Sequence, residues 1–243
     1  MTPILRAELR KLRYTRSLVA VLVCGIATAL VGATLLLIVG EPVDIGGSLS
    51  AYGPLRFGPS NFGLLLVLFG VRLLADETHH GTLAGTLMRT PDRRRVLLAK
   101  AVVASASALI FCVVVYLLVI PITVVGLRFR DLPMTYDIAA TAALLGRVAA
   151  TMALLAASGV ALGAAARNRT IALVAVVAWF ALGEDLVGAL LGIERFLPGA
   201  AAQSLVSASV SSATSALVAA LLLVAFLAAT AGAAALSLRR DIA

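Results

Sequence analysis

Side chains of the kinds that bind metal ions lie close together at Asp76, Glu77, His79 and His80, and the two histidines are the only ones in the chain. Adjacent residues on a helix point about 100° apart, so His79 and His80 do not converge on one ion as a pair spaced by four residues would. This stretch therefore predicts a solvated polar turn and no metal site.

No pattern of a nucleotide-binding or catalytic site occurs in the chain. A phosphate-binding loop, a zinc-protease HExxH, a CxxC pair and a serine-hydrolase GxSxG are all missing. Cys24 and Cys112 lie inside apolar runs, where a small soft side chain packs well and no disulfide is implied. We expect no catalytic residue, no metal and no cofactor bound by this chain itself.

The composition is that of an integral membrane protein. The chain is 61% hydrophobic and 13% charged, and its mean hydropathy of +1.06 exceeds what a soluble core of this size needs. Apolar runs of about 20 residues predict helices, because the strands of a membrane barrel are about 10 residues long and alternate in polarity. The expected fold class is all-α, with residues 1–243 forming one transmembrane domain.

Six membrane-spanning helices are predicted, with an amphipathic interfacial helix before them and a short re-entrant outer hairpin between the fifth and sixth. Pro59 is expected to begin the second span, and Pro121 to kink or end the third. The interfacial helix covers residues 1–16, the spans cover about 17–39, 60–75, 96–125, 138–166, 170–191 and 215–238, the loop between spans two and three covers 76–95, and the hairpin covers 184–213.

The distribution of charge orients these spans. The face that holds both termini, residues 76–100 and residues 167–169 carries fourteen Lys and Arg residues against five acids, whereas the opposite face carries four against seven. Basic residues concentrate on the cytoplasmic side of membrane proteins, so both termini are predicted to be cytoplasmic. The formal net charge of +8 then reflects topology, and we expect no nucleic-acid partner.

Two arginines lie at or within the predicted spans. Arg72 can snorkel to the interface and pair with Asp76 four residues later. Arg147 is either about 14 Å deep, as a functional candidate, or an interfacial anchor if the membrane begins near Val148, and the anchor is favoured.

Polar side chains inside the spans can line a ligand path or satisfy helix backbones. The candidate pathway residues are Thr28, Ser105, Arg147 and Thr151.

Two further features concern the later spans. Gly159 and Gly163 permit close helix approach but do not identify a dimer face in so glycine-rich a chain.

Glu184 and Asp185 interrupt the fifth apolar run after about 20 Å of helix rise. Two adjacent acids are unfavourable in hydrocarbon, so the chain is expected to reach a water-accessible outer region there.

The stretch Glu77-x-x-x-Gly81-Thr82, followed by Pro91, Arg95 and Lys100, resembles the cytoplasmic loop of permeases of the type-2 class of ATP-binding-cassette (ABC) exporters. The resemblance covers most of the chain, from the basic amphipathic N-terminal helix to a Leu197-Pro198 element before the last span. It implies two permease chains, as a homodimer or heterodimer in membrane lipid. Each would bind a separate cytosolic ATPase subunit that holds ATP and Mg²⁺.

The resemblance also implies roles for particular residues. A connecting helix at about Leu5 to Arg16 and a coupling helix at about Glu77 to Met88 would pass the closure of the ATPases to the spans. The N-terminal helix could instead be a topology anchor alone. The implied coupling residues are Arg10, Arg13, Glu77, His80, Gly81, Thr82 and Leu83, and the implied outer gate comprises Glu184, Asp185, Arg195 and Pro198, whose charged members could instead simply be solvated.

The expected function is that of the permease subunit of an ATP-driven exporter of a lipophilic or amphipathic compound in a bacterial plasma membrane. The alternative is a self-contained secondary carrier or a non-transporting membrane scaffold. A carrier normally shows ionisable residues at mid-membrane and an internal repeat. Only Arg147 fits the first criterion here, and no convincing repeat is found.

Overall fold

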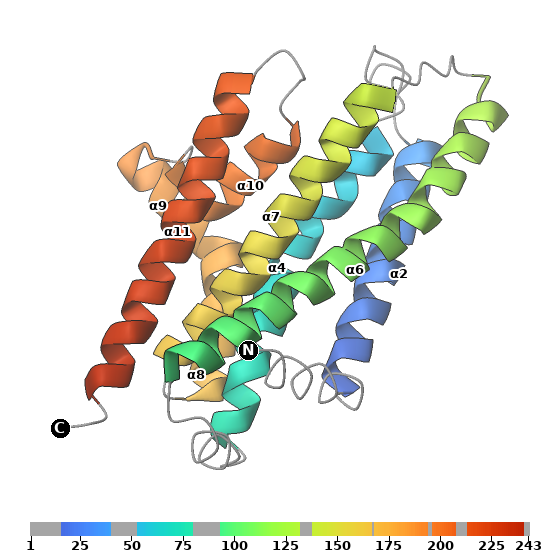
Figure 1. The fold of residues 1–243 in the computed structure, drawn as a ribbon. Coiled ribbons are helices and arrows are strands. Elements are labelled where there is room, and N and C mark those ends of the chain that lie inside the picture. Colours follow the sequence, from blue (N-terminus) through green and yellow to red (C-terminus); the bar gives the residue numbers. More distant parts are fainter. Residues whose placement is uncertain are drawn as a thin grey trace.

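The computed structural model describes residues 16–39, 53–79, 93–131, 138–166, 168–193, 196–207 and 213–240, and its regular structure there is entirely helical (Figure 1). The predicted all-α class is therefore confirmed for this part of the chain. The elements are α2 (Arg16–Val39), α4 (Gly53–His79), α6 (Arg93–Phe129), α7 (Ile138–Ala165), α8 (Arg169–Ala178), the π-helix η2 (Trp179–Gly183), α9 (Glu184–Leu191), α10 (Pro198–Ser207) and α11 (Ala213–Arg240).

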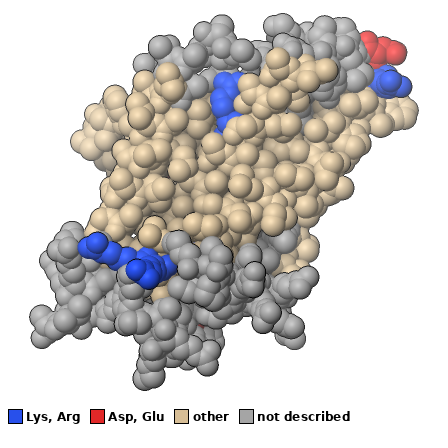
Figure 2. All heavy atoms as spheres, viewed as in Figure 1, with Lys and Arg blue, Asp and Glu red and all other residues tan. Residues whose placement is uncertain are grey.

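Three helical stretches in the described ranges are long and apolar enough to cross a membrane, namely Arg94–Phe129, Thr141–Ala165 and Thr170–Leu191. Two shorter apolar stretches, Val23–Leu35 and Leu217–Gly232, lie within α2 and α11. On the face shown in Figure 2, basic side chains lie toward both ends of the molecule and acidic ones at one end, with a band free of charged residues between. Such a band suits contact with hydrocarbon, and the helices together indicate a membrane protein.

Helix α7 lies at the centre of the bundle. It packs against α4, α6 and α11, while α2 contacts α4 and α6, and α8 contacts α4. The long helices run alternately up and down in Figure 1, so the end of α4, the starts of α2, α6 and α8, and the end of α11 lie at one end of the molecule. The short helix α10 packs near the other end, against α11, α4 and α7.

Helices α4 and α7 approach each other backbone to backbone. A Cβ atom on Gly159 would overlap the carbonyl oxygen of Val67, and one on Gly70 would overlap that of Ala156. A Cβ on Gly163 would lie 2.7 Å from the carbonyl oxygen of Val71. Only glycine fits at such a crossing. Gly159 and Gly163 therefore form an intramolecular contact with α4.

The second span differs from its predicted boundaries. Helix α4 begins at Gly53, so the prediction that Pro59 begins it is wrong. Pro54 already stands in the first turn, where the missing N–H group removes no helical hydrogen bond. At its other end, α4 continues beyond the predicted boundary at residue 75, through Asp76 and Glu77 to His79.

Pro121 does not end the third span. Helix α6 runs without interruption over 37 residues from Arg93 to Phe129, which is about 55 Å by helix rise. A hydrocarbon core is about 30 Å thick, so this helix must tilt or extend beyond it. In Figure 1, α6 crosses the bundle diagonally, which accommodates part of the excess length.

The fifth span does not stop at the two acids. Helix α8 passes through the π-helix η2 directly into α9, which ends at Gly192 with a left-handed φ of 65°. The wider helical turn of η2 comes just before Glu184, and the apolar stretch continues beyond the two acids to Leu191. The predicted boundaries of the fourth span agree with α7 to within one residue.

We expect Gly159→Val to destabilise the bundle by about 2–3 kcal/mol, because its side chain would overpack the α4–α7 crossing. Gly146→Val is the matched control, since nothing lies within 4 Å of a Cβ placed at Gly146 on the same helix. The measurement is the midpoint of thermal unfolding in detergent. Equal midpoints for the two variants would contradict the close crossing.

Candidate functional site

Most of the residues implied for ATPase coupling lie outside the described residues, and their roles stay predictions. Glu77 lies in the last turn of α4, directly before the part of the 76–95 loop that is not described. The predicted site residues outside the described ranges are Arg10, Arg13, His80, Gly81, Thr82, Leu83 and Arg195.

Lys100 joins the two helices on either side of this loop. It is only 1% exposed, and its Nζ donates a hydrogen bond of 3.2 Å to the carbonyl oxygen of Leu73 on α4. Lys100 is one of the basic residues of the predicted cytoplasmic face, whereas the structure buries its side chain between α6 and α4. Its spacing from Val96 and Val103, both buried, is the helical signal that places it on the inner face of α6.

The predicted Arg72–Asp76 pair is present in the last turns of α4. Nε of Arg72 lies 3.8 Å from Oδ2 of Asp76, with the two side chains 34% and 27% exposed. This separation is longer than a hydrogen bond. Nε of Arg72 is buried and has no hydrogen-bond partner in the described structure.

None of the four candidate pathway residues lines either of the two grooves described below. Ser105 on α6 donates across the helix interface to the carbonyl oxygen of Ala153 on α7, at 3.0 Å. The others bond to carbonyls one turn back on their own helices: Thr28 to Cys24 at 2.7 Å, Arg147 to Ala143 at 3.3 Å and Thr151 to Arg147 at 2.9 Å. Such bonds satisfy helix backbones, and a role of these residues in a ligand path stays a prediction.

Glu184 connects the start of α9 to the start of α10. Its Oε1 accepts a hydrogen bond of 2.9 Å from the backbone N–H of Gly199, in the first turn of α10. The indole of Trp179 and the N–H of Ala200 are further donors to this carboxylate. An acid at a helix N-terminus satisfies backbone donors that have no partner within the helix. Glu184 is therefore bound within the protein, whereas its neighbour Asp185 is exposed.

Gly199 leaves the space that this carboxylate occupies, because a Cβ atom there would overlap Oε2 of Glu184. Pro198 begins α10 and is buried. Its ring suits a first helical position, where no N–H is needed. The chain therefore returns from the end of α9 to the level of Glu184 before α10 enters the bundle. The re-entrant hairpin over residues 184–213 at an outer face stays a prediction.

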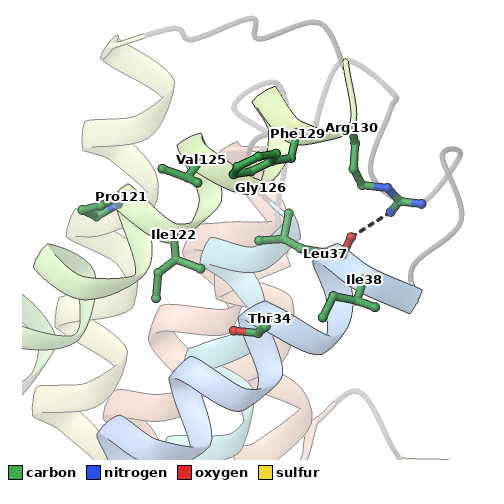
Figure 3. A pocket seen from close by; sticks show the side chains of 9 residues that line it. All are labelled: Thr34, Leu37, Ile38, Pro121, Ile122, Val125, Gly126, Phe129 and Arg130. Atoms are coloured by element: carbon green, nitrogen blue, oxygen red, sulfur yellow. Dashed lines mark hydrogen bonds between the residues drawn. The ribbon is translucent and has the colours of Figure 1, made fainter.

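One apolar groove lies between the ends of α2 and α6, with a volume of about 560 Å³. Figure 3 shows Ile122, Val125 and Phe129 of α6 facing Thr34 and Ile38 of α2 across it. At its rim, Nη1 of Arg130 donates a hydrogen bond of 2.9 Å to the carbonyl oxygen of Leu37 (Figure 3). Arg130 thus caps the end of α2, where helical carbonyls lack partners.

A second groove, which we name the Arg72 groove, has α4 as its floor and α2 and α8–η2 as its walls. Its volume is about 580 Å³, within the range of small-molecule sites. The lining is apolar apart from Arg72 and Cys24, and it consists of Ala20, Cys24, Leu65, Leu68, Arg72, Leu173, Val174, Val177, Ala178, Ala181 and Leu182. The sequence gives no local sign of this groove, because the helices that form it are far apart along the chain.

No model of a protein family matches this chain, and no curated protein matches it. Among the residues that the structure describes, no three His, Cys, Asp or Glu side chains are grouped to hold a metal ion.

We expect Glu184→Ala to loosen the start of α10, because Gly199 loses its acceptor. Loss of such a cap is worth about 1 kcal/mol, so the backbone N–H groups of Gly199 and Ala200 should exchange with deuterium roughly fivefold faster. Asp185→Ala, which removes an exposed acid, should leave that exchange unchanged. Equal rates in both variants would mean that Glu184 does not hold α10.

Proposed function

We propose that this chain is the permease subunit of an ATP-driven exporter of the type-2 ABC class. It forms the substrate path as a dimer in the bacterial plasma membrane and couples to separate cytosolic ATPase subunits. The chain crosses the membrane six times, with both termini and the 76–95 loop in the cytoplasm. ATP and Mg²⁺ are held by the partner ATPase.

The observation that carries this proposal is the placement of two features at opposite ends of one bundle. The loop that resembles a coupling element leaves α4 and enters α6 at the end where α2 begins and α11 ends (Figure 1). The short helix α10 packs among α4, α7 and α11 near the other end. A driven exporter needs a docking element on the ATPase side and a closure on the far side.

The junction between α4 and α6 supports a coupling role for this end of the molecule. The buried Lys100 bonds α6 to the carbonyl of Leu73, six residues before the end of α4 at His79. Movement of the intervening loop would therefore act on two helices that are joined. Both helices also contact the central α7, which gives such a movement a route into the bundle.

The first prediction from this proposal concerns the partner. The chain solubilised from its native membrane in a mild detergent should co-purify with an ATPase that carries the GxxxxGKS or GxxxxGKT loop that this chain lacks. Mass spectrometry of the purified complex identifies the partner. Purification without any such ATPase, from membranes where the gene is expressed, would reject the exporter proposal.

The second prediction concerns the coupling loop. Glu77→Arg and Gly81→Arg should each lower the ATPase activity of the complex at least about tenfold, because a bulky cation would disturb a close polar docking surface. Asp241→Arg, a charge reversal elsewhere on the predicted cytoplasmic face, is the control and should keep full activity. Membrane insertion, measured by fractionation, should be normal in all three. Unchanged activity in the two loop variants would remove the coupling assignment.

A further inference from the structure

We propose that the Arg72 groove binds an anionic glycerophospholipid, with the lipid phosphate on the Arg72 guanidinium and one acyl chain along the apolar walls. The inference goes beyond the exporter proposal and does not depend on an ATPase. It rests only on the placement of the chain in a membrane, with the Arg72 end of the groove toward the cytoplasmic leaflet.

The shape of the groove suits an extended hydrocarbon chain. Its floor runs along α4 from Leu65 to Arg72, about 10 Å by helix rise, and its wall runs from Leu173 to Leu182, about 13 Å. The surfaces along this length are leucine, valine and alanine side chains. An acyl chain lying parallel to the helices would contact the floor and both walls of the groove, and it would remain in the hydrocarbon of the membrane.

Arg72 supplies the recognition chemistry at one end of the groove. A guanidinium has five N–H donors in a planar fork that matches a phosphate. In the described structure its one polar interaction is the 3.8 Å ion pair with Asp76, which is too long for a hydrogen bond. Asp76 can balance the charge of Arg72 but supplies no hydrogen bond at this distance. Nε of Arg72 is buried on the side of Asp76, so a phosphate in the groove would be bound by the terminal NH₂ groups of the guanidinium.

The location of Arg72 near one end of α4 favours a ligand with an anionic headgroup. Among the α4 residues that line the groove, Arg72 is the closest to the end of that helix, on the side where α6 begins with Arg93, Arg94 and Arg95 (Figure 1). In the proposed topology, this side meets the cytoplasmic leaflet, whose anionic headgroups are attracted by basic residues. A zwitterionic headgroup such as that of phosphatidylcholine also carries a phosphate, but its trimethylammonium group cancels the negative charge and is repelled by the basic residues at this end.

Native mass spectrometry of the full chain in an uncharged detergent tests the proposal. With phosphatidylglycerol and phosphatidylcholine supplied in equal amounts, one phosphatidylglycerol per chain should be retained in preference. Arg72→Gln should weaken its retention at least about tenfold, because a charge-assisted bidentate contact is lost. Arg72→Lys should weaken it less. Ala181→Phe, which places a ring at an exposed position of the groove wall, should remove the acyl chain and the lipid.

Arg128→Gln is the matched control, since Arg128 is an exposed arginine in the last turn of α6 and does not line the groove. It should retain the lipid as the wild type does. Added phosphatidylglycerol should also raise the thermal unfolding midpoint of the wild type and Arg128→Gln, but not that of Arg72→Gln. Cooperative unfolding of each variant shows that it has folded.

Three results would overturn the proposal: equal retention of phosphatidylglycerol by Arg72→Gln, equal retention of phosphatidylcholine by the wild type, or a lipid-free dimer in which a second copy covers the groove. None of them affects the co-purification of an ATPase. The two proposals can therefore fail separately.

Discussion

The close contact between the backbones of α4 and α7 is the constraint on which the rest of the structure depends. Gly70 and Gly159 allow it, because a Cβ atom at either position would overlap a carbonyl oxygen of the other helix. With one side of α4 held against α7, its other surfaces meet α2 and α8. The Arg72 groove is formed there, with α4 as its floor. The glycine contact between α4 and α7 thus fixes the position of the helix that forms the floor of this groove.

Polar side chains in the bundle are paired with backbone groups of the protein. Ser105 and Lys100 each donate to a carbonyl on a neighbouring helix, and Arg130 donates to the end of α2. Glu184 does the reverse and accepts from the N–H of Gly199. A hydrocarbon environment offers no hydrogen-bond partners, so the protein must supply them. Nε of Arg72 makes no such bond in the described structure, and Arg72 is the one charged residue that lines the Arg72 groove.

Several predicted helix positions agree with the structure because they depend on local chemistry. Helix α6 begins directly after Pro91 and Asp92, and α7 covers nearly the whole predicted fourth span. The prolines were less informative. Pro59 lies inside α4 and Pro121 inside α6, because a helix can lose one backbone hydrogen bond when neighbouring residues and helices hold it in place. A proline in the sequence does not show whether neighbouring helices will stabilise a helix that continues through it.

The sequence by itself determined that the chain is helical and apolar, with a basic loop between the second and third predicted spans, since these follow from composition, run length and charge. It also predicted the Arg72–Asp76 pair, because residues four apart on a helix are neighbours. Only the tertiary structure decided that Lys100 is buried, that Gly159 contacts α4, and that Glu184 holds α10. Each of these depends on which helix lies beside which, and contacts between residues distant in sequence leave no local pattern to read.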